Sequence, residues 1–178
     1  SLPLAFGTTL ESIPSPGPYI EAPLDLQFEW ETAHPATASP RIGLVWAGNP
    51  EHGNDLHRSI PLATLRPLLE GSGNEFFILQ KDISEQDRSM LQECPGVVFA
   101  SDRFTDFRDT AAAVAQLDLV ITVDTSVAHL AGAMGRPVWT LLPFMPDYRW
   151  LLGRSDSPWY ASMRLFRQEK AGDWEGVI

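Results

Sequence analysis

The chain has 178 residues, enough for one domain with a full hydrophobic core, with or without extra segments. With 44% hydrophobic and 20% charged residues, it has the composition of an ordinary folded protein. The net charge of −10 argues against general binding to nucleic acid or to an acidic membrane surface. No apolar run approaches the roughly 20 residues of a membrane-spanning helix. The single cysteine, Cys94, indicates a reducing compartment, so we expect a cytoplasmic protein.

Residues 1–40 differ from the rest of the chain. Seven of the 15 prolines lie here, and proline fixes φ and removes a backbone donor, so we expect little regular structure. Apolar residues such as Leu4, Phe6 and Trp30 indicate that this segment packs on another part of the protein. We therefore expect residues 1–40 to be an extended segment that ends in a linker (33–40), and residues 41–178 to be the folded domain. Because the chain begins with Ser1 rather than Met, we also expect it to be a piece of a longer protein.

From Arg41 onward, apolar runs of strand type alternate with helix-type segments. This alternation is typical of βαβ units and a mainly parallel sheet. It predicts a doubly wound α/β fold with a six-stranded, Rossmann-like sheet. The expected strands cover residues 41–47, 75–80, 96–100, 118–123, 137–142 and 162–168.

Helix start and stop signals fall between these strands. Ser59 is placed to cap a helix over residues 60–70, which Pro67 would kink or break early and Gly71 would end. Similar signals accompany the other helices that we expect: Ser84 with Asp87, Asp106 with Asp109, Asp173 before a terminal helix, and Gly135 as the stop of the helix after the fourth strand.

The expected strand order, 3-2-1-4-5-6, places the first and fourth strands side by side. In such sheets, ligands bind outside the carboxyl ends of the strands, at the point where the order reverses. Two loops flank that point, residues 48–59 after the first strand and 124–126 after the fourth. We therefore expect a binding crevice between these loops.

The segment from Asp124 to His129, D-T-S-V-A-H, carries the strongest functional signal. The backbone N–H groups of Thr125, Ser126 and Val127 would form a helix N-terminus suited to a diphosphate. His129 lies one turn beyond Thr125, within reach of a phosphate or a sugar. The purely structural alternative makes Asp124 an ordinary N-cap and His129 a core histidine.

The loop after the first strand contains Gly48 and Asn49, where a ligand can approach the backbone. It lacks the G-x-G-x-x-G pattern, so hydride transfer with a dinucleotide is not supported. Arg58 is either a phosphate partner or a solvated arginine. Four nearby residues carry metal-binding groups at a spacing that matches no standard site: Glu51, His52, Asp55 and His57.

Two further loops add candidates at the same edge of the expected sheet. Gln80 and Lys81 end the second strand, where they either lie near a ribose or base or form an exposed strand end. The segment between the third strand and the next helix contains Phe104, Thr105, Asp106 and Phe107. Of these, Phe104 either lines a base pocket or has a core or capping role.

The stretch D-T-S-V-A-H-L-A-G-A-M-G-R-P-V-W resembles the C-terminal domain of bacterial GT-B glycosyltransferases of the heptosyltransferase type, glycosyltransferase family 9. The segments R-I-G-L-V-W-A-G-N-P, H-R-S-I-P-L, L-L-P-F-M-P-D-Y-R-W-L-L and S-P-W-Y-x-S-M-R-L-F-R-Q look like the branch in which this unit follows tetratricopeptide repeats. The likeness spans about 41–178, and residues 1–40 look like the end of an N-terminal acceptor domain and its linker.

The resemblance implies the nucleotide-sugar-binding half of a GT-B enzyme, with no metal and no cofactor besides the donor substrate. It implies Arg58 and His129 as catalytic residues, and Ser126 stands where the family's D-[ST]-G-x-x-H segment has glycine. The donor-binding residues it implies are Gly48 and Asn49 in the first phosphate loop, Lys81 near the ribose, Phe104 and Thr105 near the base, and Asp124, Thr125 and Ser126 near the diphosphate and sugar.

By resemblance, the reaction is transfer of a sugar from a nucleoside diphosphate to an acceptor hydroxyl on a glycan, lipid or protein. Arg58 and the helix N-terminus would stabilise the leaving diphosphate. The general base would come from the missing acceptor domain, so we expect this chain to bind nucleotide but to be inactive alone. The alternatives are a non-catalytic nucleotide-sugar-binding or scaffold module beside helical repeats, and another GT-B-like activity such as an epimerase or hydrolase.

Overall fold

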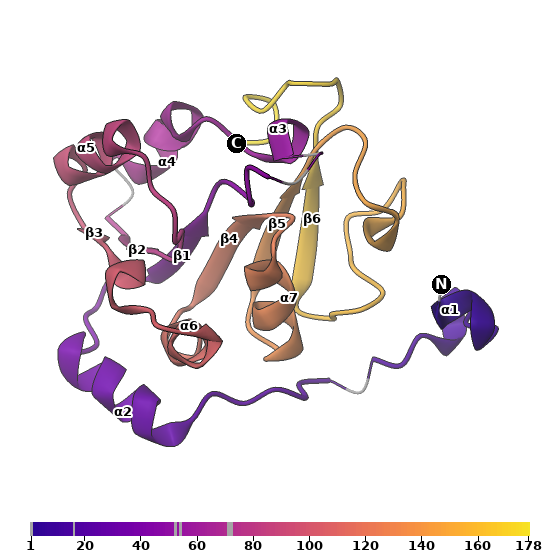
Figure 1. The fold of residues 1–178 in the computed structure, drawn as a ribbon, viewed down its shortest axis with the longest axis horizontal. Coiled ribbons are helices and arrows are strands. Elements are labelled where there is room, and N and C mark those ends of the chain that lie inside the picture. Colours follow the sequence, from indigo (N-terminus) through magenta and orange to yellow (C-terminus); the bar gives the residue numbers. More distant parts are fainter. Residues whose placement is uncertain (1, 16, 52, 54, 71–72) are drawn as a thin grey trace.

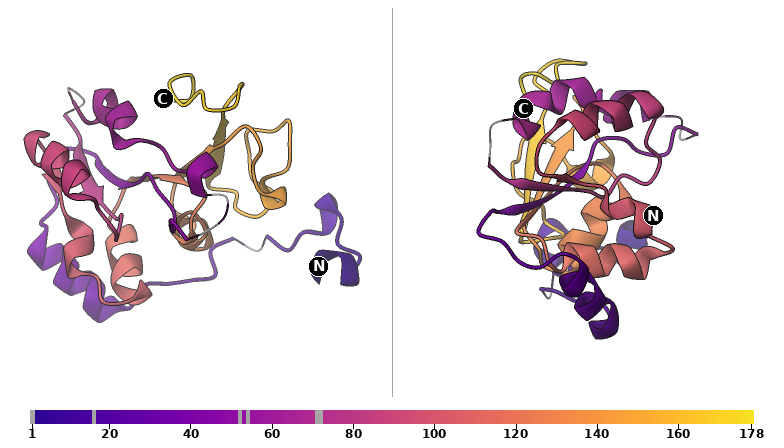
Figure 2. Two further views of the ribbon diagram at one scale, coloured as in Figure 1. Left: turned by 45° about the horizontal axis from the view of Figure 1, so that its top comes forward. Right: turned by 90° about the vertical axis from the view of Figure 1, so that its left-hand side faces the viewer.

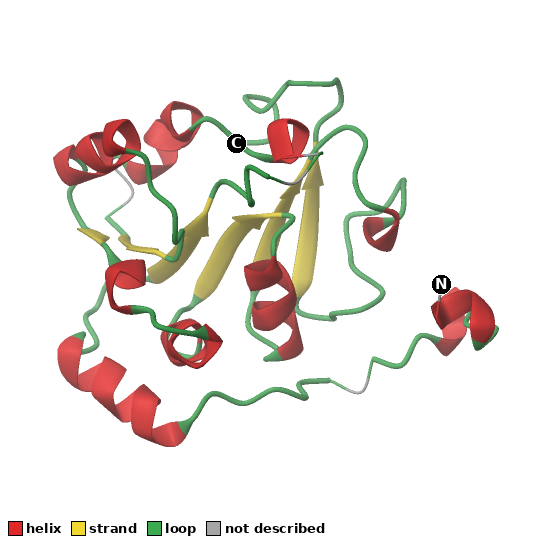
Figure 3. Ribbon diagram, viewed as in Figure 1, coloured by secondary structure: helices red, strands yellow, loops and turns green. Residues whose placement is uncertain are grey.

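Six strands form one sheet in the order β3-β2-β1-β4-β5-β6, and every neighbouring pair is parallel (Figures 1 and 3). This computed structural model describes residues 2–15, 17–51, 53, 55–70 and 73–178. The strands are β1 (Arg41–Val45), β2 (Glu75–Ile78), β3 (Val97–Val98), β4 (Leu119–Val123), β5 (Val138–Leu142) and β6 (Met163–Arg167). The predicted strand order and the doubly wound α/β class are therefore confirmed.

Helices cover both faces of the sheet (Figures 1 and 2). One face packs on the 3-10 helix η2 (Leu62–Leu65), α4 (Arg66–Leu69) and α5 (Glu85–Glu93). The other packs on α2 (Leu24–Ala33), α6 (Phe107–Val114) and α7 (Ser126–Ala133). The short helix α3 (Asp55–Arg58) follows β1 and contributes none of its described residues to either core. The central strands β1, β2 and β4 are largely buried on both sides because they are mostly apolar runs, as is typical of parallel sheets, whereas the edge strands β3 and β6 are only partly buried. Leu44 packs in one core and its neighbour Val45 in the other.

Most helix signals predicted from the sequence are confirmed. The Ser84 side chain accepts a hydrogen bond from the Asp87 backbone N–H at 3.1 Å, and Asp106 and Asp109 form a capping box at the start of α6. Gly135 has φ of 69°, the left-handed conformation that ends α7 at low steric cost. These local contacts place α6 and α7, whose N-termini border the candidate site.

Three predictions about helices were wrong. Ser59 caps no helix, and its hydroxyl accepts a hydrogen bond from the Gly48 backbone N–H. The helix over 60–70 is broken into η2 and α4, as the proline allowed, with Pro67 in the first turn of α4. Asp173 starts turns rather than a helix, and its carboxylate accepts from Gly176 N–H at 3.0 Å. The short helix α3 lies inside the segment expected to be loop, and Gly71 lies outside the described residues.

The N-terminal segment is partly helical. It contains α1 (Leu2–Ala5), the 3-10 helix η1 (Leu10–Ser12) and the ten-residue α2, which forms because no proline falls between Pro23 and Pro35. Trp30 of α2 is buried in the core beneath the sheet. Two further 3-10 helices, η3 (Ala100–Arg103) and η4 (Tyr148–Trp150), complete the secondary structure of the described residues.

The extended stretch between η1 and α2 packs on the end of α7. The backbone N–H groups of Tyr19 and Ile20 both donate to the carbonyl of Ala133, and Pro18 lies against Gly135. At the far end of this stretch, α1 lies away from the sheet (Figure 1). None of the helices in the described parts of the chain is long and apolar enough to cross a lipid bilayer.

Candidate functional site

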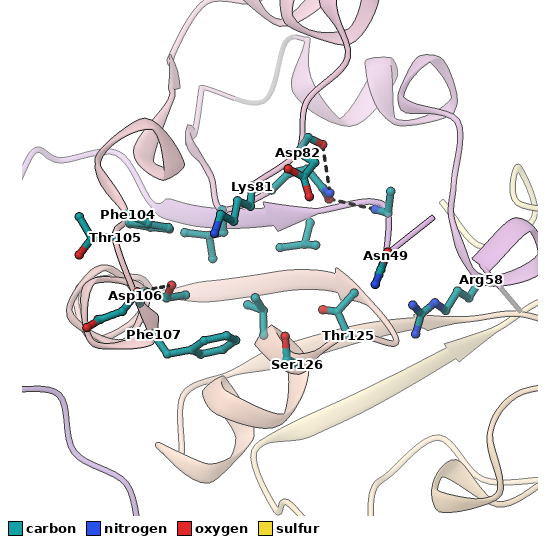
Figure 4. Close-up of a pocket in the computed structure, with 17 residues that line it drawn as sticks. Asn49, Arg58, Lys81, Asp82, Phe104, Thr105, Asp106, Phe107, Thr125 and Ser126 are labelled. Carbon is teal, nitrogen blue, oxygen red and sulfur yellow. Dashed lines mark hydrogen bonds between the residues drawn. The ribbon is translucent and has the colours of Figure 1, made fainter. Parts of the chain in front are cut away.

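A cavity of about 320 Å³ opens at the carboxyl edge of β1, β2 and β4 (Figure 4). This is where the strand order reverses and where the sequence predicted a crevice. The lining includes eight of the ten residues predicted to act in binding or catalysis: Gly48, Asn49, Arg58, Lys81, Phe104, Thr105, Thr125 and Ser126.

The N-terminus of α7 forms one wall of the cavity and leaves its first donors open. Thr125 is the N-cap residue, with extended backbone (φ −136°, ψ 171°), but its hydroxyl hydrogen-bonds to that of Thr122 at 3.0 Å and does not cap the helix. Among the described residues, no group accepts from the backbone N–H of Ser126 or Val127. Open N–H groups at a helix N-terminus attract anions, and the helix dipole adds to that attraction.

The loop after β1 forms the facing wall, and the backbone N–H groups of Ala47 and Gly48 already have acceptors. Ala47 N–H donates to the side-chain oxygen of Gln80 at 3.1 Å, and Gly48 N–H donates to the Ser59 hydroxyl at 3.0 Å. The Asn49 side-chain oxygen accepts from Glu51 N–H at 2.9 Å, which leaves its NH₂ group as a donor. Gln80, predicted to lie near a ribose or base, is 6% exposed and holds this loop in place.

Arg58 and Lys81 supply the positive charge of the cavity. Arg58 is not a solvated arginine: its side chain is 15% exposed, and its guanidinium donates to Asp55 and to the backbone carbonyl of Asp124. Its guanidinium points toward the N-terminus of α7 (Figure 4). Lys81 is exposed and lines the cavity from the end of β2. Two cations and an open helix end favour an anion at this position, although Asp82 and Asp106 also line the cavity.

The segment before α6 forms an aromatic end of the cavity. Phe104 and Phe107 both line it, and the 54% exposed ring of Phe107 was not singled out from the sequence as a site residue. The Thr105 backbone N–H and hydroxyl donate to Asp109 at 2.7 and 2.6 Å. The hydroxyl bond is the main reason why the pKa of Asp109 lies below its usual value. Both Thr105 donors are thus occupied, and Phe104 and Phe107 give this end of the cavity an apolar lining.

Asp124 and His129 are not among the described residues that line the cavity. Asp124 is 8% exposed and reaches the site through its carbonyl oxygen, which accepts from Arg58 at 3.1 Å. The His129 ring stacks on Trp150 with centroids 5.1 Å apart, and its Nδ1 lies 3.1 Å from the Tyr160 hydroxyl. Burial, with a smaller contribution from Arg149, lowers the pKa of His129. Contact of His129 with a substrate stays a prediction.

The residues with metal-binding groups near the cavity are not gathered into a cluster. Asp55 is engaged with Arg58, and His52 lies outside the described residues. Within the described ranges, no three His, Cys, Asp or Glu side chains are placed to hold a metal ion.

The segment from α5 to the loop after β5 has known relatives. Residues 92–153 match the model of glycosyltransferase family 9 (heptosyltransferase). The matched segment contains α6, β4, α7 and β5, and so the aromatic end of the cavity and the open helix N-terminus.

Two known proteins resemble a larger part of the chain. Protein FlbA of Caulobacter vibrioides is 32% identical over 143 residues, which cover 78% of this chain and 24% of FlbA. The crystal structure of the glycosyl transferase family 9 from Veillonella parvula superposes with a TM-score of 0.60 and 16% identity, over 90% of this chain and 49% of that one. The latter similarity shows the fold. The chain thus spans about a quarter of FlbA and about half of the solved transferase.

Proposed function

We propose that the cavity binds the nucleoside diphosphate of a sugar nucleotide, and that the chain is the donor-binding part of a glycosyltransferase. The observation that carries this proposal is the open N-terminus of α7 facing Arg58 across one cavity. The family match of residues 92–153, which contain that helix, supports sugar transfer as the reaction.

The diphosphate subsite lies between α7 and Arg58. The N–H groups of Ser126 and Val127 point a positive partial charge at one side of the bound anion, and Arg58 meets the other. When the bond between sugar and diphosphate breaks, negative charge grows on the leaving phosphate oxygens. Donors already fixed around those oxygens stabilise that charge in the transition state without reorganising.

The nucleoside extends from this subsite toward the aromatic end of the cavity. Lys81 lies on the ribose side, and Phe104 and Phe107 offer apolar faces to a base. Because Arg58, Lys81 and a helix N-terminus neutralise the diphosphate, we propose that binding needs no divalent metal. Chelation of divalent ions should then leave the affinity unchanged.

The acceptor site lies in a part of the enzyme outside this chain. The solved family 9 structure is about twice as long as the stretch that this chain matches, which leaves room for a second half that holds the acceptor. We propose that the two halves form a GT-B enzyme, with residues 41–178 as the donor domain. The 178-residue chain should then bind nucleotide without transferring sugar.

Thermal unfolding with ADP, UDP and GDP tests the proposal. A nucleotide at 100 times its Kd adds about 2.7 kcal/mol to the free energy of unfolding. For a chain of this size that gain raises Tm by roughly 5–10 °C. Arg58→Ala should abolish most of the rise. Arg66→Ala is the matched control, because Arg66 pairs with Glu70 on the exposed surface at 2.6 Å and does not line the cavity.

A rise in Tm that is the same in wild type and Arg58→Ala would place nucleotide binding elsewhere and contradict the proposal. Sugar transfer by the isolated chain would contradict the two-part arrangement while leaving the donor site intact. Nucleotide binding with no transfer by any longer form of the protein would favour a non-catalytic binding module.

A further inference from the structure

Arg58 owes its orientation to two acceptors on different elements. Its Nε donates to Oδ1 of Asp55 at 3.1 Å, and its Nη1 donates to the backbone carbonyl of Asp124 at 3.1 Å. The short helix α3 places Asp55 and Arg58 three residues apart, so the ion pair forms within one turn. The Asp124 carbonyl is fixed by its place at the end of β4. Two acceptors on separate rigid elements define the plane of the guanidinium.

The Asp55–Arg58 ion pair is also largely buried. Arg58 and Asp55 side chains are 15% and 12% exposed, so water competes weakly for their hydrogen bonds. Both lie against the backbone of Gly48, where an added Cβ would overlap the Arg58 Nη2 atom and the Asp55 carboxylate. Gly48 therefore blocks movement of the guanidinium on that side.

The two residues differ in their relation to the cavity. Arg58 lines it, whereas Asp55 is not among the described lining residues. No described protein group accepts a hydrogen bond from Nη2 of Arg58, which lies close to Gly48. Asp55 accepts a hydrogen bond from Nε of the cation without itself contributing to the described lining of the cavity.

We propose that Asp55 is a positioning residue, whose carboxylate orients the Arg58 guanidinium toward the diphosphate. This inference rests on the proposed function of the cavity. A carboxylate close to an anion site lowers affinity by its charge alone. Its benefit must therefore come from geometry: a fixed fork loses less rotamer freedom on binding than a free arginine does.

Titration calorimetry of the 178-residue chain with ADP, UDP and GDP tests this role, using the nucleotide that wild type binds most tightly. Asp55→Ala should weaken binding about tenfold, which corresponds to one lost charge-assisted hydrogen bond. Asp55→Asn keeps a side-chain oxygen that can accept from Nε and should stay within about threefold of wild type. In the Arg58→Ala background, Asp55→Ala should change affinity less than about twofold, because no guanidinium remains to position.

A matched control and a second variant complete the test. Glu70→Ala removes the carboxylate of a surface Arg–Glu pair and should leave nucleotide affinity unchanged. If Asp55→Ala does not fold, Asp55→Glu keeps the charge but moves the carboxylate by one methylene, and it should still weaken binding at least about threefold. Wild-type affinity in Asp55→Ala or, failing that, in Asp55→Glu would overturn the inference.

Two other outcomes separate this inference from the proposed function. An equal loss of affinity on Asp55→Ala with and without Arg58 would show a general structural role and overturn the positioning role alone. If wild type binds none of the three nucleotides, the proposed function fails, and the inference fails with it.

Discussion

The loop after β1 and the turn after β4 face each other across the cavity, but they differ in where their hydrogen-bond donors go. In the first loop, the N–H groups of Ala47 and Gly48 are bound by Gln80 and Ser59. In the second, the N–H groups of Ser126 and Val127 have no acceptor among the described residues. Both segments follow the carboxyl end of a strand, but Ala47 and Gly48 have satisfied N–H groups whereas Ser126 and Val127 have open ones.

This difference implies that the two segments offer different hydrogen-bond donors to a ligand. In the loop after β1, the satisfied N–H groups of Ala47 and Gly48 hold the chain in place, and Asn49 and Arg58 line the cavity. An uncapped helix end keeps unsatisfied donors in a fixed direction, which is what an anion needs. We therefore expect binding of the diphosphate to depend on backbone N–H donors of α7 and on side-chain donors of the segment after β1.

Removing one open backbone donor should have the largest effect. Ser126→Pro deletes the N–H at the first position of α7, where proline is well tolerated because that N–H has no partner inside the helix. The extended backbone of Thr125 also suits a residue before proline. We expect nucleotide affinity to fall about 10- to 100-fold with little change in Tm of the free protein.

Ser126→Ala is the control for this prediction, because it removes the hydroxyl and keeps the N–H. Calorimetry should show a clearly smaller loss of affinity for Ser126→Ala than for Ser126→Pro. Equal losses would mean that the hydroxyl, and not the open helix end, binds the ligand.

Adding a methyl group at Gly48, in the loop after β1, should have the next largest effect on nucleotide affinity. In Gly48→Ala the new methyl group would overlap the Arg58 guanidinium, which must move away from its fixed position. We expect about a tenfold loss of nucleotide affinity. The control is Gly53→Ala, since a Cβ at Gly53 meets nothing within 4 Å, and it should bind as wild type does. Wild-type affinity in Gly48→Ala would show that the position of Arg58 is unimportant.

Much of the fold could be predicted from the sequence, because β1, β2, β4 and β5 are mostly apolar runs and helix signals separate most of the strands. The strand order follows from the alternation of strands and helices together with the reversal that doubly wound sheets share. The helix α2 was missed because the many prolines of residues 1–40 concealed a ten-residue stretch that has none. Ser59 was assigned as a cap because a serine before an apolar run is a common N-cap signal, whereas its actual partner, Gly48, lies eleven residues earlier.

The candidate site was predictable in its location but not in its hydrogen bonds. Gly48 and Ser126 both lie in the lining, yet nothing local reveals that one has its N–H bound and the other does not. The Asp55–Arg58 pair had a readable signal, opposite charges three residues apart, but the surrounding glycine and asparagine residues indicated a loop. Long-range partners decide these details, and spacing in the sequence does not report them.

Removing the Ser59 hydroxyl, which accepts from Gly48 N–H in the loop after β1, should affect stability more than nucleotide binding. Ser59→Ala leaves Gly48 N–H without its partner, which we expect to lower the free energy of unfolding by about 1 kcal/mol. Nucleotide affinity should change less than about threefold, because that N–H does not face the ligand. Chemical denaturation and calorimetry measure the two effects separately. A large loss of affinity with unchanged stability would mean that Ser59 itself contacts the nucleotide.

The smallest effect is on the pH dependence of stability, through His129 of α7, which is not among the described residues that line the cavity. Burial lowers the pKa of His129 below its value in the unfolded chain, so the unfolded state takes up a proton first as pH falls. The neutral ring therefore contributes stability that is complete above the unfolded pKa of about 6.5 and is lost as pH falls below it. His34, whose pKa is also lowered mainly by burial, adds a loss of the same sign. His129→Gln should reduce the fall in Tm between about pH 7 and pH 5, and His34→Gln should reduce the remainder. An unchanged pH profile in His129→Gln would show that the ring beside Trp150 and Tyr160 takes up a proton as readily in the folded state as in the unfolded state.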